Sequence, residues 1–147
     1  MQKTCEYLIL HHTATDRDTT TLKAVNENHR KKWNLKRSRG YYCGYGYFID
    51  GQGVITKTRS DRDVGIHCPQ QRMNYRSIGI TLTGNFEKQQ LNDKQVESLK
   101  TLLYVLKQTY NIKNNNILGH KEVEGTKTLC PGKNFLQWIE MYKKNNK

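Results

Sequence analysis

Three side chains that can bind a metal ion stand where apolar stretches end or where a loop is punctuated by glycine and proline. His11 follows the apolar run 7–10, His120 follows the short apolar step 117–118, and Cys130 stands before a Pro-Gly pair. Loops held by a rigid scaffold can aim side chains from distant parts of a chain at one point. Two imidazoles and one thiolate, with a fourth position left to water, are the ligand set of a catalytic rather than a structural zinc site.

Spacing alone does not decide for zinc, because the two histidines lie far apart in the chain and no Cys-x-x-Cys pair is present. Each residue also has an ordinary structural interpretation: His11 as a strand-end histidine bonded to backbone, Cys130 as an inert buried thiol, and His120 as a loop cap. A hydrolase in which an imidazole activates Cys130 or Cys68 as a nucleophile is a second chemical alternative. Sensitivity to chelators or to alkylating agents separates the two chemistries.

The apolar patterns predict secondary structure that alternates between strands and helices. Strands are indicated by short apolar or period-two runs, and helices by apolar residues at three- and four-residue steps. Asn92 can cap its helix, with Gln95 placed for a capping box. The predicted strands are 7–10, 45–49, 54–57 and 77–83, with a short step at 117–118, and the predicted helices are 20–33, 92–110 and 135–142. We therefore expect a mixed sheet flanked by helices.

Length and composition indicate one domain, residues 1–147, around a modest core. The 147 residues lie near the commonest domain size, with no Gly/Ser-rich linker. Hydrophobic residues make up 35% and charged residues 26% of the chain. No apolar stretch is long enough for a membrane span, and the first residues lack the apolar core of a secretory signal. The expectation is a protein that is cytoplasmic until it is released to the cell wall or periplasm.

The net charge of +12 predicts attraction to polyanions such as nucleic acid, anionic membrane or the anionic polymers of bacterial walls. The densest basic run, 29–39, is better interpreted as a solvated helix end and loop than as a nucleic-acid site, because no nucleic-acid-binding motif accompanies it. The four cysteines are irregularly spaced, which favours free thiols or a metal role over disulfides.

Several ordered motifs carry a resemblance to a known family. The sequence resembles the zinc-dependent N-acetylmuramoyl-L-alanine amidases, which include phage lysozyme-type endolysins and the animal peptidoglycan recognition proteins. The resemblance extends from about Tyr7 to Trp138 and rests on segments 8–14, 44–49, 74–80, 84–86, 119–123 and 128–132. It implies the fold of that family, an α/β domain with a central mixed, mostly parallel β-sheet flanked by helices.

The resemblance implies a zinc cofactor, with His11, His120 and Cys130 as its ligands. It also implies a substrate: the peptidoglycan amide between N-acetylmuramic acid and the L-alanine of the stem peptide. The short basic chain is similar to phage or prophage endolysins. We expect a monomer that binds peptidoglycan and associates weakly with anionic wall polymers, with no specific nucleic acid as partner. The alternative is a non-catalytic peptidoglycan-binding recognition module, which the presence of Cys130 argues against.

Two further residues are implied to act in catalysis. By resemblance, Tyr45 lies beside the metal-bound water, where it could orient that water or stabilise the oxyanion. Phage members of the family carry a lysine two residues before the cysteine ligand, whereas this chain has Thr128 there and Lys127 one place earlier. Threonine at this position resembles the catalytic recognition proteins. We therefore expect Thr128 to assist the oxyanion, with Lys127 as the less favoured candidate.

Three residues are expected to bind substrate. His67 occupies a loop in which the family often has a histidine lining the substrate groove. Asn74 and Arg76 stand just before the 77–83 strand and could hydrogen-bond the glycan or the peptide carboxylates, although an ordinary polar loop explains them equally well. His12 is expected to point away from the metal, because neighbouring residues of a strand face opposite sides of the sheet.

Overall fold

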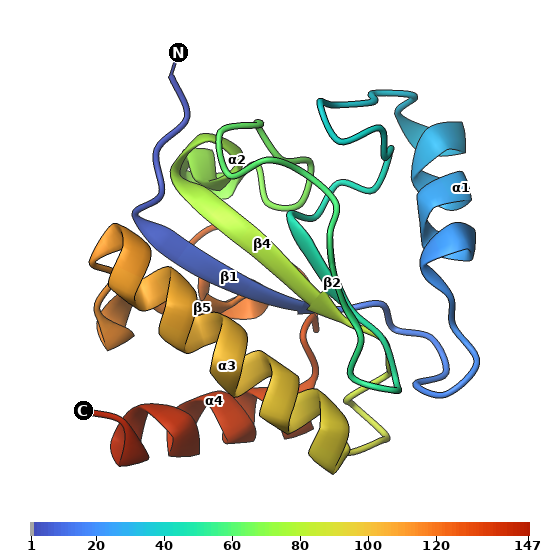
Figure 1. Ribbon diagram of the computed structural model, residues 1–147. Helices are drawn as coiled ribbons and strands as arrows, with labels where there is room; N and C mark the ends of the chain where they lie inside the picture. The colour runs from blue at the N-terminus through green and yellow to red at the C-terminus, as the bar shows by residue number, and fades with distance from the viewer. Residues whose placement is uncertain (1) are drawn as a thin grey trace.

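The computed structural model describes residues 2–147, and a five-stranded sheet forms its centre (Figure 1). The strands lie in the order β3-β2-β4-β1-β5, and only the β2–β3 pair is antiparallel. This confirms the prediction of a mixed, mostly parallel sheet flanked by helices. The strands are β1 (Tyr7–His12), β2 (Tyr47–Ile49), β3 (Ile55–Lys57), β4 (Ser77–Leu82) and β5 (Ile117–Gly119).

Strand β1 occupies the middle of the parallel part of the sheet, between β4 and β5. Residues 8–12 are all buried, as expected of a parallel strand covered on both faces. Side chains alternate between the faces. Leu8 and Leu10 join the main core, whereas Ile9 belongs to a smaller cluster. His11 therefore faces the side opposite the main core, and its register partner on β4 is Thr81.

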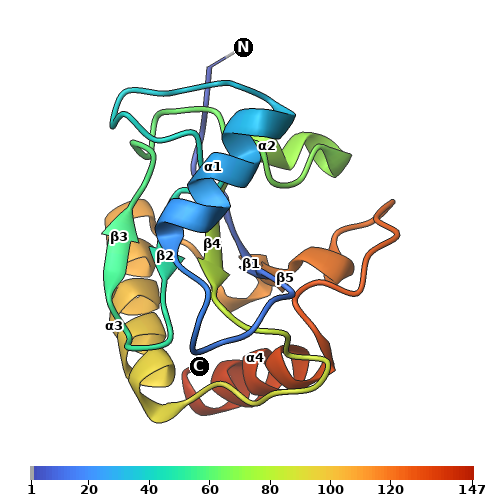
Figure 2. The ribbon, with the colours of Figure 1, turned by 90° about the vertical axis from the view of Figure 1, so that its right-hand side faces the viewer.

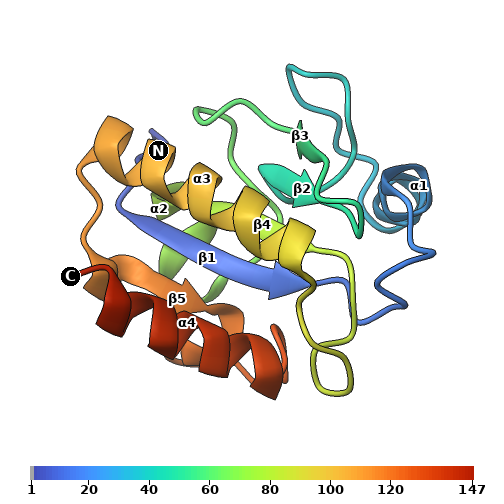
Figure 3. The same cartoon turned by 60° about the horizontal axis from the view of Figure 1, so that its bottom comes forward.

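Two long helices cover the main-core face of the sheet. Figures 1 and 3 show α3 (Asp93–Tyr110) and α4 (Lys133–Asn145) side by side across it. Helix α3 buries Leu99, Leu103 and Leu106, which recur at helical spacing on one side. Its N-terminus has the predicted Asn92/Gln95 capping box. No helix within residues 2–147 has both the length and the apolar character that crossing a membrane requires.

The remaining helical segments lie toward the other side and the ends of the sheet. Helix α1 (Leu22–Lys32) stands apart from the sheet in Figure 1 and faces the viewer in Figure 2, and only His29 within it is buried. The amphipathic pattern predicted this helix, but its apolar side chains do not join the core. The shorter segments are α2 (Met73–Arg76), η1 (Gln70–Arg72), η2 (Asn114–Asn116) and η3 (His120–Glu122).

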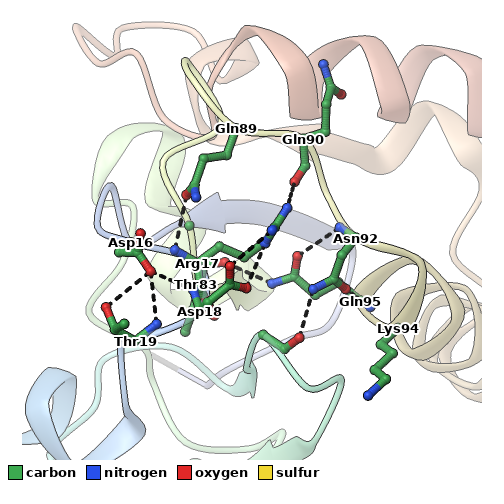
Figure 4. Close-up of polar contacts among 12 residues, drawn as sticks. Asp16, Arg17, Asp18, Thr19, Thr83, Gln89, Gln90, Asn92, Lys94 and Gln95 are labelled. Carbon is green, nitrogen blue, oxygen red and sulfur yellow. Dashed lines mark hydrogen bonds and ion pairs between the residues drawn. The ribbon is translucent and has the colours of Figure 1, made fainter.

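A polar network ties the loop after β1 to the start of α3 (Figure 4). Arg17 donates from its guanidinium to the Gln90 carbonyl at 2.8 Å, and its own carbonyl accepts from the Thr83 hydroxyl at 3.0 Å. Gln95, fully buried, donates to the Thr83 carbonyl at 2.8 Å. Asn92 donates to the Gly51 carbonyl at 2.8 Å. The helix cap and the loop are thus held by the same contacts, which fixes one wall of the site described below.

Candidate metal centre

Three metal-type donors meet at the carboxyl edge of the parallel strands. His11 lies near the end of β1, and His120 is the first residue after β5, so both strands deliver their histidines to the same edge. Cys130 arrives on the loop before α4, which is held by the hydrogen bond from the Lys121 amide to the Cys130 carbonyl at 2.8 Å. One ligand atom from each of the three residues lies within 4.8 Å of the others. The structure therefore brings the predicted set together.

The distances fit a single zinc ion. The His11 Nδ1 atom and the Cys130 Sγ atom are 3.6 Å apart. Tetrahedral zinc with ordinary Zn–N and Zn–S bond lengths would hold these two atoms about 3.6 Å apart. The rings of His11 and His120 lie with centroids 4.7 Å apart, close enough to share one ion. The His12 amide donates to Sγ at 3.4 Å, which stabilises a thiolate at this position.

The protonation states also suit a metal better than a thiol nucleophile. Burial lowers the pKa of His11 well below its usual value and lowers that of His120, so both imidazoles are neutral and keep a free lone pair. Burial raises the pKa of the Cys130 thiol to about 12 and that of Cys68 to about 11. A thiol nucleophile needs a lowered pKa, whereas a bound dication deprotonates a coordinating thiol outright.

The donors line an open cleft of about 720 Å³. Its rim includes Trp33 at the end of α1 and Leu129 on the loop before Cys130, which are 40% and 60% exposed and offer apolar contacts. A second hollow of about 450 Å³ lies between the loop after β1 and α1. Tyr45 lines both hollows. The two volumes are within the usual range for small-molecule sites, and together they can hold an extended ligand.

Tyr45 lies beside the donors, as the resemblance implied. Its ring centroid is 4.9 Å from that of His11. Burial is the main cause that raises the pKa of its phenol, and the neighbouring Cys130 adds to it, so the hydroxyl stays protonated and can donate a hydrogen bond. The buried Thr81 hydroxyl lies beside the phenol, and its hydrogen bonding to the phenol offsets part of this rise in pKa.

The segment that carries Tyr45 is anchored by several hydrogen bonds. The Gly46 amide donates to the Gly79 carbonyl at 2.8 Å, and the Thr58 hydroxyl donates to the Tyr45 carbonyl at 2.7 Å. The Gly44 amide donates to Nδ1 of His29 at 2.8 Å. His29 can accept only while that nitrogen is unprotonated. Helix α1 thus contributes to the site through one buried, neutral histidine.

The stability of the metal-free protein should fall as His29 becomes protonated. Burial, with Lys32 and Arg59 nearby, lowers the pKa of His29 to about 4 from the usual 6.5. As the pH falls, His29 is therefore protonated in the unfolded chain before it is protonated in the folded protein. The stability that neutral His29 contributes is fully present above pH 6.5 and is lost between pH 6.5 and 4. We expect a loss on the order of 2 kcal/mol in the free energy of unfolding over that interval, below the roughly 3 kcal/mol of the full pKa difference, because solvent partly screens the ring. Denaturant titrations in chelator at several pH values measure it.

His29→Asn is the matched variant for this measurement. The amide oxygen of asparagine can still accept from the Gly44 amide but does not titrate. The stability of the variant should therefore depend less steeply on pH than that of the unmodified protein. Equal slopes for the two proteins between pH 6.5 and 4 would contradict the role given to His29.

Thr128 and Lys127 both line the cleft, so the structure places both candidate oxyanion groups within it. The Thr128 hydroxyl oxygen accepts from the Cys130 amide at 3.1 Å. Its own proton is therefore available for a hydrogen bond to a ligand. Lys127 is exposed. The geometry thus favours Thr128 as the ordered donor.

The predicted substrate-binding residues are placed differently from one another. His67 lines the cleft but is only 9% exposed, and both its ring nitrogens have partners within the protein. The Asn74 side-chain oxygen also lies at the cleft, where it accepts from the His67 and Cys68 amides at 2.8 and 2.9 Å. Arg76 does not line the cleft. It lies over Tyr7 and pairs with Glu6 at 3.3 Å.

Some residues around the centre were not singled out from the sequence. His12 was expected to turn away, and its Nδ1 atom indeed accepts from the Phe86 amide at 3.1 Å. No local sequence pattern, by contrast, predicted the roles of His29, Ser77 and Thr81. Only the period-two pattern of 77–83 could have placed Ser77 and Thr81 on one face of the sheet, the face that His11 shares.

The fold and the site define an α/β protein with a His/His/Cys set suited to one metal ion. The chain belongs to the N-acetylmuramoyl-L-alanine amidase family, because the model of that family matches residues 1–133. This confirms the family resemblance found in the sequence.

Similar proteins include both amidases and recognition proteins. The structure of the N-acetylmuramoyl-L-alanine amidase LysC from Clostridium intestinale URNW is similar with a TM-score of 0.81 and 30% identity, over 99% of this chain and 88% of that one. Peptidoglycan-recognition protein SC2 of Drosophila melanogaster is 30% identical over 137 residues, 92% of this chain and 71% of that protein. One chain of the solved ectodomain complex of the peptidoglycan recognition proteins LCa and LCx with bound tracheal cytotoxin shares the fold at 22% identity and a TM-score of 0.79, over 97% of this chain and 86% of that one.

Proposed function

We propose that residues 1–147 form a single zinc-dependent N-acetylmuramoyl-L-alanine amidase domain. It hydrolyses the amide between the lactyl group of N-acetylmuramic acid and the L-alanine of the stem peptide. The observation that carries the proposal is the convergence of His11, His120 and Cys130, whose ligand atoms lie within 4.8 Å at the cleft. Hydrolysis consumes one water and leaves a lactyl carboxylate and a free L-alanine amino group.

The residues of the chain divide the work of the reaction. Zinc in such a site supplies Lewis acidity, which activates water and polarises the scissile carbonyl. Thr128 and the protonated Tyr45 can donate hydrogen bonds to the carbonyl oxygen as negative charge develops on it. The apolar rim and the two hollows beside Tyr45 offer room for the glycan and the stem peptide on either side of the bond.

An endolysin is the kind of amidase that the relatives favour. Two similar solved structures are clostridial amidases at 30% and 29% identity, each covering 99% of this chain, and the second is described as an endolysin. The net charge of +12 suits additional weak association with anionic wall polymers. The second candidate is a peptidoglycan-binding module without catalysis, which the similarity to recognition proteins keeps open. The complete His/His/Cys set favours the enzyme.

Muropeptide release tests the proposal. Purified protein incubated with peptidoglycan should release stem peptides with free L-alanine amino termini and should contain about one zinc per chain. A chelator should abolish release, and added zinc should restore it. Bound zinc without release would support the recognition module instead. Release that survives metal removal but is lost on thiol alkylation would overturn the zinc mechanism.

Replacing Tyr45 with phenylalanine should lower the turnover number about 100-fold with zinc still bound, because one donor to the developing oxyanion is lost. Zinc content and steady-state rates on a soluble muropeptide measure the two effects separately. Tyr47→Phe is the matched control, since its hydroxyl bonds Asp61 at 3.1 Å and does not line the cleft. A Tyr45→Phe variant as active as the control would remove Tyr45 from the mechanism.

A further inference from the structure

His67 lies directly behind His11, and little of its side chain is open to the cleft. Nδ1 of His67 is 2.9 Å from Nε2 of His11, the ring nitrogen that faces away from Cys130. Two glycines make room for the His67 ring: a Cβ atom added to Gly79 would lie 2.8 Å from the ring, and one added to Gly65 would lie 2.6 Å from it. The ring therefore rests against strand β4, and its place leaves little freedom to move.

The hydrogen bonds around His67 form a chain that ends on a backbone carbonyl. The Ser77 hydroxyl donates to the Met73 carbonyl at 2.6 Å. A carbonyl only accepts, and a serine hydroxyl has one proton. The Ser77 oxygen must therefore act as the acceptor toward Nε2 of His67, which lies 3.3 Å away.

This direction determines the tautomers of both rings. If Nε2 of neutral His67 holds the proton, its Nδ1 has a lone pair and accepts from Nε2–H of His11. His11 then keeps a lone pair on Nδ1. That nitrogen is the one 3.6 Å from Cys130 Sγ, where a shared metal ion would sit.

We propose that Ser77 and His67 are positioning residues that fix His11 as its Nε2–H tautomer and so present Nδ1 to the metal. The inference rests on the zinc site of the proposed function and extends it to two residues that touch neither the metal nor the substrate. Hydrogen bonds of this kind orient the ring and raise the basicity of the ligating nitrogen, and their loss typically weakens metal affinity 10- to 100-fold.

Ser77→Ala is the direct test. Without the serine oxygen, His67 can adopt its Nδ1–H tautomer, which would donate to His11 and place the His11 proton on Nδ1. Long-range ¹⁵N–¹H spectra of the metal-free protein should show Nε2–H at His11 in the unmodified chain and a loss of that state in the variant. Competition with a chromogenic chelator should show zinc affinity reduced about 10-fold or more.

Two companion variants separate positioning from general damage to the fold. Thr81→Val also removes a buried hydroxyl from the same face of β4. Thr81 is not part of the hydrogen-bonded series from Met73 to His11, so this variant should leave the His11 tautomer unchanged. His67→Asn can still accept from Nε2–H of His11 through its amide oxygen, so it should keep more zinc affinity than His67→Ala. Circular dichroism checks that each variant folds. If Ser77→Ala does not fold, the comparison of the two His67 variants tests the inference instead.

The outcomes distinguish this inference from the proposed function. A proton on Nδ1 of His11 in the unmodified protein would overturn the inference, whatever the activity. So would a Ser77→Ala variant with the same tautomer and the same zinc affinity, even if the protein is an active amidase. An unmodified protein that binds no zinc would overturn the proposed function and the affinity part of the inference, whereas the spectra would still decide the tautomer part.

Discussion

Replacing Cys130 with alanine is expected to release the zinc and to lower amide hydrolysis by at least about 1000-fold. The variant loses one of three protein ligands, and with the metal it loses several kcal/mol of transition-state stabilisation, where about 4 kcal/mol corresponds to a factor of 1000. Metal analysis of the purified protein and the release of free L-alanine amino termini measure the two losses. Cys68→Ala, which removes a buried thiol that is not among the three donors, should keep both zinc and activity.

Cys130→Asp decides whether the sulfur acts as a ligand or as a nucleophile. A carboxylate oxygen can bind zinc in place of a thiolate, so the aspartate variant should retain more zinc than Cys130→Ala and measurable hydrolysis. A mechanism that forms a thioester on Cys130 predicts instead that both variants are equally inactive. If both variants lost hydrolysis equally although the aspartate form still bound zinc, the result would favour the nucleophile.

The sequence predicted most elements because their patterns are local. The apolar run of β1 predicts a strand that is buried along its length, and the three- and four-residue steps of α3 predict a helix with one buried side. The structure has both. Helix α1 is the instructive exception. Its pattern predicts a buried face, but only His29 is buried, because the apolar side faces a hollow instead of the sheet.

The convergence of the donors could be predicted only in part. Parallel strands that end at one edge explain why His11 and His120 meet. The strand order that makes β1 and β5 neighbours, however, cannot be predicted from the sequence of either strand. Cys130 is placed by the loop between η3 and α4, and the family resemblance rather than any spacing rule identified it. The chain through Ser77 and His67 depends on which atoms face each other across the sheet, which periodicity does not specify.

Arg59 illustrates a second kind of information that sequence patterns do not contain. In the sequence it is one cation among 25, but in the structure its side chain is only 1% exposed and has no carboxylate within ion-pair distance among the described residues. Its guanidinium donates to backbone carbonyls of the segment that leads to Tyr45 and to one carbonyl of the loop after β3. The acceptors are the carbonyls of Leu35, Tyr42, Cys43 and Val64, at 3.0, 3.4, 2.7 and 3.0 Å.

Replacing Arg59 with methionine is therefore expected to destabilise the protein by about 4 kcal/mol, because one buried and three part-buried hydrogen bonds from a charged donor to backbone carbonyls are lost. For a chain of this size that corresponds to a fall of roughly 10 °C or more in the melting temperature. Thermal unfolding followed by circular dichroism measures it. Arg59→Lys keeps the charge but not the planar fork, so it should fall between methionine and arginine.

The same substitution should also affect the site, since three of the four carbonyls that Arg59 holds belong to the segment preceding Tyr45. At a temperature where Arg59→Met is still folded, zinc affinity should be nearly unchanged, because His11, His120 and Cys130 come from other segments, whereas the turnover number should fall. Arg62→Met, at an exposed position in the same loop, is the matched control and should change stability by less than about 0.5 kcal/mol. If Arg59→Met proved as stable as this control, the guanidinium would not be what holds the segment. The ordering of Tyr45 would then have to come from the other anchors of the segment, which include His29, Thr58 and the Gly79 carbonyl.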